Sequence, residues 1–215
     1  LLILRKFEKQ HFKYQLWNSH TKKIQPLDQI PPLPYQDQNS FTHINDSGDI
    51  YRYSRLGIDF LYSHQKKQFI YDELGNTHHF FDTRTVDMAN YPNLDFLAAT
   101  RGEGLLFVKN KKPFALKKQH GLLSNQLTSL AVDSSQRIWV GSSKGLNIID
   151  SNFNIINLRT EEGLISNEIT DIVITKTRAY VGTKKGLSVL DIASIQKEEF
   201  DIPVYIKSVK TSTGK

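Results

Sequence analysis

The chain repeats itself about every 41 residues, and this period constrains the fold more than any other feature of the sequence. Residues 121–150 read GLLSNQLTSLAVDSSQRIWVGSSKGLNIID, and residues 163–191 read GLISNEITDIVITKTRAYVGTKKGLSVLD. Four landmarks return 41 or 42 residues later: Gly121 as Gly163, Asn125 as Asn167, Gly141 as Gly182 and Gly145 as Gly186. Gly57 and Gly104 mark weaker copies upstream, so about five units would fill the 215 residues.

One unit reads as four short strands separated by polar turns. The runs are rich in apolar and β-branched residues and are bounded by Gly, Asn, Asp and Ser: 127–132, 137–141, 146–149 and 154–158. Four strands in about 40 residues are typical of a propeller blade, and no window shows the spacing of a helical repeat. We therefore predict an all-β chain, a β-propeller of about five four-stranded blades, either complete or part of a larger propeller.

The amino-acid composition of the chain argues against several classes of function. The chain has no cysteine, which excludes disulfides and thiolate metal sites. Its net charge is +6, but the basic residues do not interleave with a recognisable nucleic-acid-binding module, so we expect no nucleic-acid partner. No run of about 18 apolar residues occurs, so we expect membrane contact only through segments outside this sequence. The opening Leu1-Leu2-Ile3 lacks an initiator methionine, which favours a piece of a longer protein.

The sequence offers no motif for catalysis or metal binding. GxSxG, GxxxxGK[ST] and dinucleotide-binding fingerprints are missing, although a carboxylate pair assembled from distant blades stays open. The segment His78-His79-Phe80-Phe81 reads as a strand, whose alternating side chains would keep the two histidines from sharing a metal ion. Residues 46–49 lack the 12-residue calcium-loop pattern and read as a hairpin turn. We predict no catalytic residue, no metal site and no cofactor.

These residues resemble the two-component regulator propeller repeat. The segments GLLSNQLTSLAVD, IWVGSSKGL and NIID fit its pattern of GLxxNxV, an acidic residue, lWiGTxxGL and a closing hydrophobic-Asp pair. In the first copy, Ser142 replaces the usual threonine. In the second copy, Tyr180 stands at the tryptophan position and Thr175 stands where Asp133 stands in the first.

The tail of the chain resembles a second module of the same family. Residues 201–210, DIPVYIKSVK, are similar to the first strand of the immunoglobulin-like Y_Y_Y domain, which follows the last propeller repeat in that family. The expected organisation is therefore a propeller over residues 1–200, with clear repeats at 121–160 and 163–196, and a truncated Y_Y_Y domain at 201–215.

The resemblance implies a role in signalling rather than an activity of this chain. It implies the periplasmic ligand-sensing region of a bacterial transmembrane two-component receptor, with a histidine kinase or diguanylate cyclase as output elsewhere in the protein. Many such sensors are linked to glycan uptake, so the expected ligand is an oligosaccharide or a related nutrient, and the expected assembly is a homodimer through the receptor. The alternative is a protein–protein interaction scaffold without a small ligand, and an enzyme is a less favoured third class.

One rim of the propeller is the expected ligand site, because the loop into the first strand of a blade and the loop between its second and third strands share one face. Residues identical between the repeats, such as Asn125 and Asn167, are predicted to maintain the blade. Trp139 and Tyr180 are predicted to pack between blades rather than to stack on a sugar. Residues that differ on the same rim are the ligand-binding candidates: Arg101, Glu103, Gln126, Lys144, Glu168 and Lys185.

The densest basic residues suggest a positive surface. The favoured interpretation of Lys109–Lys112 and Lys117–Lys118 is an outer strand and loop whose charges are solvated. The alternative is that they join Lys144 and Lys185 in one patch that faces an anionic glycan or an acidic partner.

Overall fold

The computed structural model describes the chain as a series of small antiparallel sheets. The residues it describes are 2–8, 11–18, 23–26, 41–55, 57–63, 65–66, 68–74 and 78–195. The tail with the expected Y_Y_Y strand, residues 201–215, lies outside them.

Five sheets succeed one another along the described chain, and we number them as blades. Blade 1 holds β1 (Leu2–Glu8), β2 (His11–Asn18) and β3 (Lys23–Pro26). Blade 2 holds β4 (Phe41–Ile44), β5 (Ile50–Ser54), β6 (Gly57–Ser63) and β7 (Gln68–Glu73). Blade 3 holds β8 (Thr85–Ala89), β9 (Phe96–Thr100), β10 (Leu105–Lys109) and β11 (Lys112–Leu116). Blade 4 holds β12 (Leu127–Val132), β13 (Ile138–Ser142), β14 (Gly145–Ile149) and β15 (Ile155–Leu158). Blade 5 holds β16 (Ile169–Ile174), β17 (Arg178–Thr183) and β18 (Gly186–Asp191).

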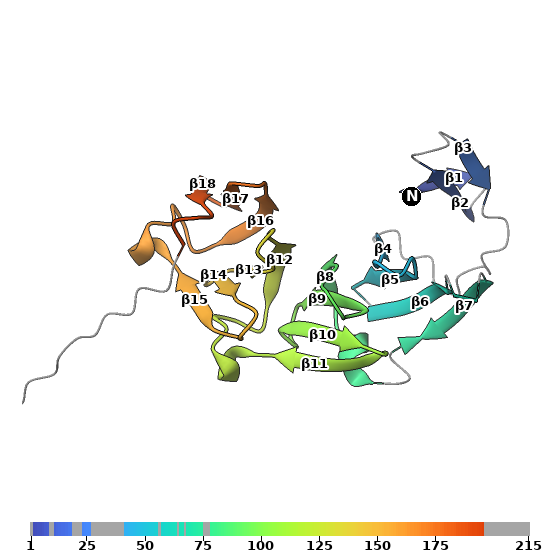
Figure 1. Cartoon of the computed structure of the whole chain (residues 1–215), viewed down its shortest axis with the longest axis horizontal. Helices are drawn as coiled ribbons and strands as arrows, with labels where there is room; N and C mark the ends of the chain where they lie inside the picture. The colour runs from blue at the N-terminus through green and yellow to red at the C-terminus, as the bar shows by residue number, and fades with distance from the viewer. Residues whose placement is uncertain are drawn as a thin grey trace, which may run out of the picture.

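The blades follow an open arc, with the first strand of each of blades 2 to 5 on its inner side (Figure 1). Within a blade, each strand pairs with the next one in the sequence. Between blades, β8 contacts β12, and β12 contacts β16. This confirms the prediction of an all-β propeller with four-stranded blades. Within the described ranges, the helices are short 3-10 turns, and none is long and apolar enough to cross a membrane.

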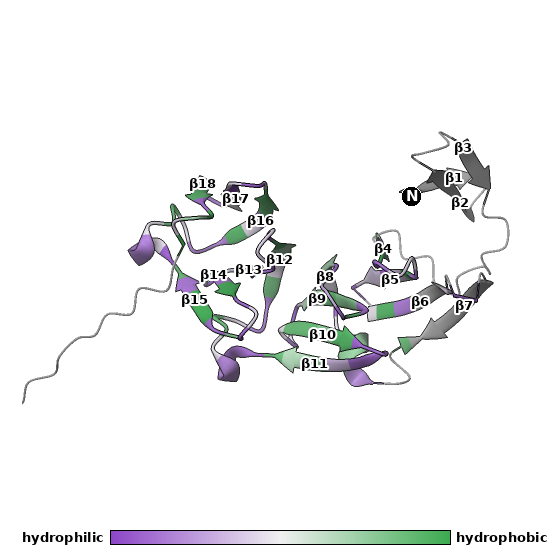
Figure 2. Ribbon diagram, viewed as in Figure 1, coloured by the Kyte–Doolittle hydropathy of each residue, from purple (hydrophilic) through white to green (hydrophobic). Residues whose placement is uncertain are grey.

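The core consists of three apolar layers, one between each pair of neighbouring blades from blade 2 to blade 5. Alternating side chains of one strand enter different layers, because successive residues of a strand point to opposite faces. In β13, Ile138 and Val140 pack toward blade 3, whereas Trp139 packs toward blade 5. Figure 2 shows this pattern as apolar strands joined by polar turns. Near-continuous apolar strands are therefore explained by burial on both faces.

The predictions for two local segments, a turn at residues 46–49 and a strand at residues 78–81, have different outcomes. Residues 46–49 form the β4–β5 hairpin turn, closed by a bond from Gly48 N to Asn45 O (2.9 Å), as predicted. The strand expected at His78–Phe81 is wrong, because residues 79–82 form a 3-10 helix. The Nδ1 atom of His78 accepts the N–H of Phe80 (3.2 Å), so the imidazole caps this helix and satisfies one of its free donors.

Candidate ligand-binding rim

A side-chain hydroxyl closes the same rim turn in three blades, between the second and third strands. In each blade the hydroxyl donates to the carbonyl of the glycine at the turn: Thr100 to Gly104 (2.8 Å), Ser142 to Gly145 (3.1 Å) and Thr183 to Gly186 (2.8 Å). It also accepts the N–H of the residue before that glycine, which is Glu103, Lys144 or Lys185. Three of the candidate residues therefore project from equivalent points of the rim. Serine serves as well as the usual threonine at 142, because only the hydroxyl is used.

The loop that enters each blade is held by the asparagine that both repeats share. The Oδ1 atom of Asn125 accepts the N–H of Lys118 (2.6 Å), and the Oδ1 atom of Asn167 accepts the N–H of Thr160 (2.8 Å). The carbonyl of Asn125 also accepts the N–H of Gly104 (3.1 Å), which ties blade 4 to the rim turn of blade 3. These bonds confirm that the two asparagines maintain the blade.

Three of the candidates lie together where blades 3 and 4 meet. Arg101 and Gln126 pair as an isolated antiparallel bridge, and both side chains are exposed. Glu103, from the same turn as Arg101, forms an ion pair with Lys117. The nitrogen of Lys117 also lies 4.8 Å from the centre of the Phe80 ring. Lys117 is thus engaged by a carboxylate and an aromatic face rather than free for a ligand.

The other three candidates lie together where blades 4 and 5 meet. Glu168 forms an ion pair with Lys184 (2.5 Å). Lys184 directly precedes Lys185 in the chain and is not among the candidates predicted from the sequence. The hydrogen bond and the charge of Lys184, with smaller contributions from Lys185 and Lys144, hold the pKa of Glu168 below its usual value. All four side chains are exposed. We call Lys144, Glu168, Lys184 and Lys185 the lysine cluster, because it carries three positive charges and one negative charge.

The structure contradicts the alternative of a single positive patch that includes Lys109–Lys112. Lys109–Lys112 form the turn between β10 and β11, at the far end of these strands from Gly104 and the rim. Alternation of strand direction sends this turn to the opposite face of the propeller from Lys144 and Lys185. Only Lys117 and Lys118 share the rim with the lysine cluster.

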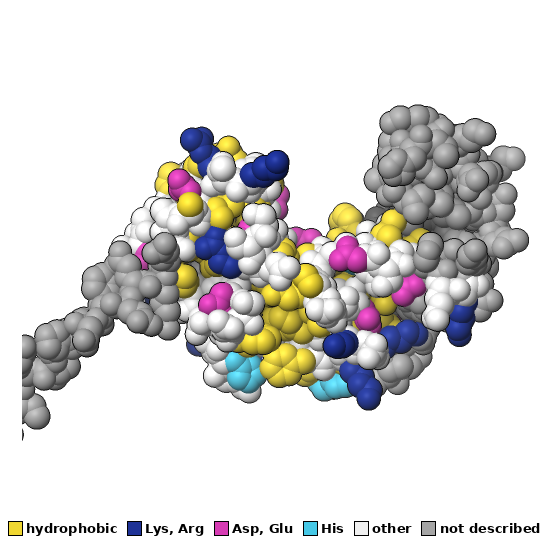
Figure 3. Space-filling view, in the orientation of Figure 1, with side chains coloured by type: hydrophobic (Ala, Val, Ile, Leu, Met, Phe, Trp, Pro, Cys, Tyr) yellow, Lys and Arg dark blue, Asp and Glu magenta, His cyan; other side chains and the backbone are white. Residues whose placement is uncertain are grey.

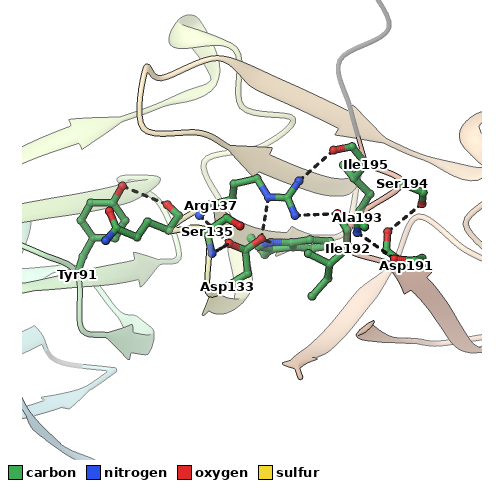
Figure 4. Close-up of polar contacts among 11 residues, drawn as sticks. Tyr91, Asp133, Ser135, Arg137, Asp191, Ile192, Ala193, Ser194 and Ile195 are labelled. Carbon is green, nitrogen blue, oxygen red and sulfur yellow. Dashed lines mark hydrogen bonds and ion pairs between the residues drawn. The ribbon is translucent and has the colours of Figure 1, made fainter. Parts of the chain in front are cut away.

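A buried acidic residue organises the opposite end of blade 4 (Figure 4). One carboxylate oxygen of Asp133 accepts bonds from Arg137 Nε (2.7 Å) and Trp139 Nε1 (3.0 Å). Burial opposes the ionisation of Asp133, but the hydrogen bonds from Trp139 and Arg137, together with the charge of Arg137, outweigh it and lower its pKa. Trp139 is fully buried, which confirms that it packs between blades. Tyr180 is half-buried.

The same end carries hydrogen bonds that link neighbouring blades, and no sequence motif indicates them. Tyr91 of blade 3 donates its hydroxyl to Gln136 O of blade 4 (3.2 Å). Arg137 of blade 4 donates to Ile192 O (2.8 Å) and Ile195 O (2.9 Å), just beyond the last strand of blade 5. The blades are therefore joined at this end through their turns (Figure 4).

Exposed aromatic side chains form another feature that the sequence analysis did not identify. Phe114 and Phe153 are each more than half exposed, and the ring of Phe107 packs against both of them. Figure 3 shows hydrophobic side chains gathered where blades 3 and 4 meet. Phe153 belongs to the turn of residues 150–154, at the other end of blade 4 from the lysine cluster, whereas the Phe114 ring stacks on His120 of the loop that enters blade 4, with 6.4 Å between the ring centres.

Residues 121–144 match the family model of the two component regulator propeller. Among curated proteins, none matches the sequence. The chain is similar to the extracellular domain described as that of a hybrid two component system, BT3049, from B. thetaiotaomicron, at 18% identity and a TM-score of 0.60 over 94% of this chain. It is also similar to the extracellular domain of BT4673 from the same organism, at 13% identity and a TM-score of 0.60 over 83% of this chain.

PorZ, a surface component of the type-IX secretion system of Porphyromonas gingivalis, is similar over 88% of this chain, with 14% identity and a TM-score of 0.59. The chain covers 28%, 24% and 32% of these three solved chains in turn. At these identities the likeness establishes the fold. The chain is therefore a β-propeller in which residues 121–144 match the two component regulator propeller model.

Proposed function

We propose that this chain is part of the periplasmic sensing region of a two-component signalling receptor. The observation that carries the proposal is the match of residues 121–144 to the two component regulator propeller family, in a chain with the fold of the extracellular domain described as that of a hybrid two component system. The match covers residues 121–144, whereas the likeness of fold extends over 94% of the chain. In this proposal the propeller spans residues 1–200, and residues 201–215 begin a Y_Y_Y sandwich.

The ligand of this sensing region would bind at the rim, over the lysine cluster. Lys144, Lys184 and Lys185 leave the cluster with an excess of positive charge after Glu168 is paired with one of them. Such a surface favours an anionic ligand through attraction during encounter and through direct ion pairs. An acidic oligosaccharide fits this charge, and the six candidate residues on the rim would contact it: Arg101, Glu103, Gln126, Lys144, Glu168 and Lys185.

Calorimetric titration of the whole chain tests the ligand. The probes are an oligogalacturonate and a neutral glucan oligomer of the same length. We expect heat and a raised melting temperature with the oligogalacturonate, and binding at least about tenfold weaker in a Lys144→Glu/Lys185→Glu double variant. The matched control is Lys176→Glu, an equally exposed lysine at the opposite end of blade 5, which should bind normally. Equal binding by the double variant and the control would remove the lysine cluster from the proposal.

Sequencing the gene on both sides of this segment tests the receptor itself. A signal peptide upstream, with a Y_Y_Y domain, a membrane helix and a kinase or cyclase downstream, would support the receptor. A stop codon soon after Lys215, or a catalytic domain without a membrane helix, would contradict it and favour the scaffold.

A further inference from the structure

A histidine packs against the apolar layer between blades 2 and 3. The ring of His43, in β4, meets the ring of Phe96, in β9, edge to face, with 6.5 Å between the ring centres. Its cross-strand neighbour in β5, Tyr51, packs against the same phenylalanine ring at 4.6 Å. Tyr51 and Phe96 are buried members of this layer. Blade 2 therefore contacts blade 3 partly through an imidazole ring.

The same position of the repeat is an alanine at the next two junctions. In each of blades 2, 3 and 4, a residue of the first strand pairs with the second residue of the second strand, which is buried toward the next blade. These pairs are His43 with Tyr51, Ala89 with Leu97, and Ala131 with Trp139. Blade 2 thus has an ionisable ring where the other two blades have a small apolar side chain.

One nitrogen of the His43 ring is buried and unpaired. Its Nε2 atom has no hydrogen-bond partner among the residues that the structure describes. A charged ring buried without acceptors is costly, so this environment favours the neutral imidazole. Burial lowers the pKa of His43 below its usual value, and the opposing effects of Asn90 and Asp46 are smaller.

A hydrogen bond beside His43 also joins the two blades. The side-chain amide of Asn90, which directly follows β8 of blade 3, donates to Asp46 Oδ1 in the β4–β5 turn of blade 2 (2.7 Å). Both of these side chains are exposed. Water screens an exposed carboxylate, so Asp46 compensates a charge on the buried ring only in part.

The other ionisable groups at this junction lie around Tyr51. Asp49 belongs to the β4–β5 turn, and Asp95 directly precedes Phe96 and accepts the N–H of Lys111 (2.8 Å). Burial, followed by the charges of Asp95 and Asp49, raises the pKa of Tyr51, so the phenol stays neutral in acid. Among the groups that face one another here, the imidazole is the one whose charge changes near neutral pH.

We propose that His43 makes the junction of blades 2 and 3 sensitive to acid, so that the junction is closed while the imidazole is neutral and opens locally when the imidazole is protonated. Protonation places a charge on a ring whose buried nitrogen has no acceptor, and the ring regains water only by leaving the layer. Because the folded pKa is lowered, the contribution of His43 to stability is complete above the unfolded value of about 6.5. It is lost as the pH falls through the folded pKa.

The absence of cysteine allows a test by thiol labelling. Ala98→Cys in β9 reports on the layer between blades 2 and 3, and Ala179→Cys in β17 reports on the layer between blades 4 and 5. Both alanines are fully buried and lie in the second strand of a blade, so they form a matched pair. Each variant is labelled with a dithiodipyridine reagent, which reacts with thiols at neutral and at mildly acidic pH. The ratio of the two rates is compared at about pH 8 and about pH 5.

We expect the ratio of the rate at 98 to the rate at 179 to rise at least about threefold at the lower pH. His43→Ala, which introduces the residue of the next two junctions, should remove this rise. His43→Phe should also remove it, and it keeps a ring in the layer if the alanine variant fails to fold. His79→Gln, at an exposed histidine, is the control and should retain the rise.

Three results would overturn the proposal. The first is a ratio that stays the same at both pH values, and the second is a rise that persists in the folded His43 variants. The third is equal acceleration at 98 and 179, which would mean that acid loosens the whole propeller rather than one junction. The experiment uses no ligand, so its outcome is independent of the proposed sensing function.

Discussion

Blades 4 and 5 come from the two most similar repeats of the chain, yet their equivalent residues lie in different surroundings. Trp139 of blade 4 is fully buried and bonded to Asp133, whereas Tyr180 of blade 5 is half-buried and Thr175 replaces the aspartate. Leu146 is buried, and its counterpart Leu187 is more than half exposed. The backbone pairing of the two sheets is nevertheless the same.

This comparison shows that the repeat specifies how the strands of a blade pair, while the neighbouring blade determines which side chains are buried. The turn hydroxyls, the rim glycines and the entering asparagine recur in both blades, because each satisfies a local backbone requirement. The large side chains gain stability only where a second sheet covers them. Substitutions at equivalent positions of the two blades can therefore separate two contributions to the free energy of unfolding, that of the local hydrogen bonds and that of packing against the next blade.

The aromatic pair should give the largest difference. Trp139→Ala should lower the free energy of unfolding by about 3–5 kcal/mol, because it leaves a large cavity and removes a partner of the buried Asp133. Tyr180→Ala should cost about 1 kcal/mol, because part of the ring is already in water. Urea denaturation followed by circular dichroism measures both values. Similar losses for the two variants would mean that another sheet covers Tyr180 in solution.

The glycines that start the third strand should give the next largest difference. Gly145 has φ +127°, and an added Cβ would lie 2.6 Å from Leu158 O and 2.8 Å from Leu123 Cδ1. Gly186 has φ +133°, but its added Cβ would meet only Ile165 Cδ1, at 3.4 Å. Gly145→Ala should cost about 2–3 kcal/mol from strain plus crowding, and Gly186→Ala about 1 kcal/mol from strain.

Both glycine variants are measured by the same urea denaturation. Gly163→Ala is the control for strain without crowding, because Gly163 has φ +101° and no atom lies within 4 Å of its added Cβ. A loss at Gly186 as large as that at Gly145 would contradict the role assigned to crowding.

The aspartate of blade 4 should make stability depend on pH, and the threonine at the same position of blade 5, Thr175, should not. The pKa of Asp133 is lower in the folded chain than its unfolded value of about 3.9, so its contribution is complete above that value and is lost as the pH falls through the folded pKa. Asp133→Asn should cost about 1–2 kcal/mol at pH 7 and progressively less below pH of about 4. Thr175→Val, which removes the hydroxyl bonded to Arg178, should have the same small effect at every pH.

Denaturation of the three chains between neutral and acid pH provides the measurement. A difference between the original chain and Asp133→Asn that stays constant down to acid pH would show that the carboxylate charge contributes nothing to the fold.

The sequence predicted those features that recur with the period, and it missed those that depend on contacts across blades. The repeats alone predicted the four strands of blade 4, the burial of Trp139 and the structural role of Asn125. It also placed the six candidates at the rim. The split of these candidates into two groups, with Lys184 as an added member, depends on which turn meets which loop of the next blade.

Other differences arose where the chain departs from the repeat. The segment at residues 79–82 became a helix because the imidazole of His78 offers a cap that a strand would not use. The basic stretch at Lys109–Lys112 was grouped with the rim by composition alone, although strand direction places it at the other end. Neither outcome can be predicted from residue type alone, because each depends on where the residue lies in its blade.

The turn hydroxyls should give the smallest difference between the two blades. Ser142 is fully buried, so Ser142→Ala leaves the carbonyl of Gly145 and the N–H of Lys144 without this partner inside the protein, at a cost of about 1 kcal/mol. Thr183 makes the same two bonds in blade 5 but lies near solvent, where water can replace the hydroxyl, so Thr183→Ala should cost about half as much or less. Ser142→Thr provides the control, because it retains the hydroxyl and restores the usual residue of the repeat. If its stability lies within about 0.5 kcal/mol of the original chain, the hydroxyl is the requirement that these turns share, whereas a loss as large as that of Ser142→Ala would refute this role.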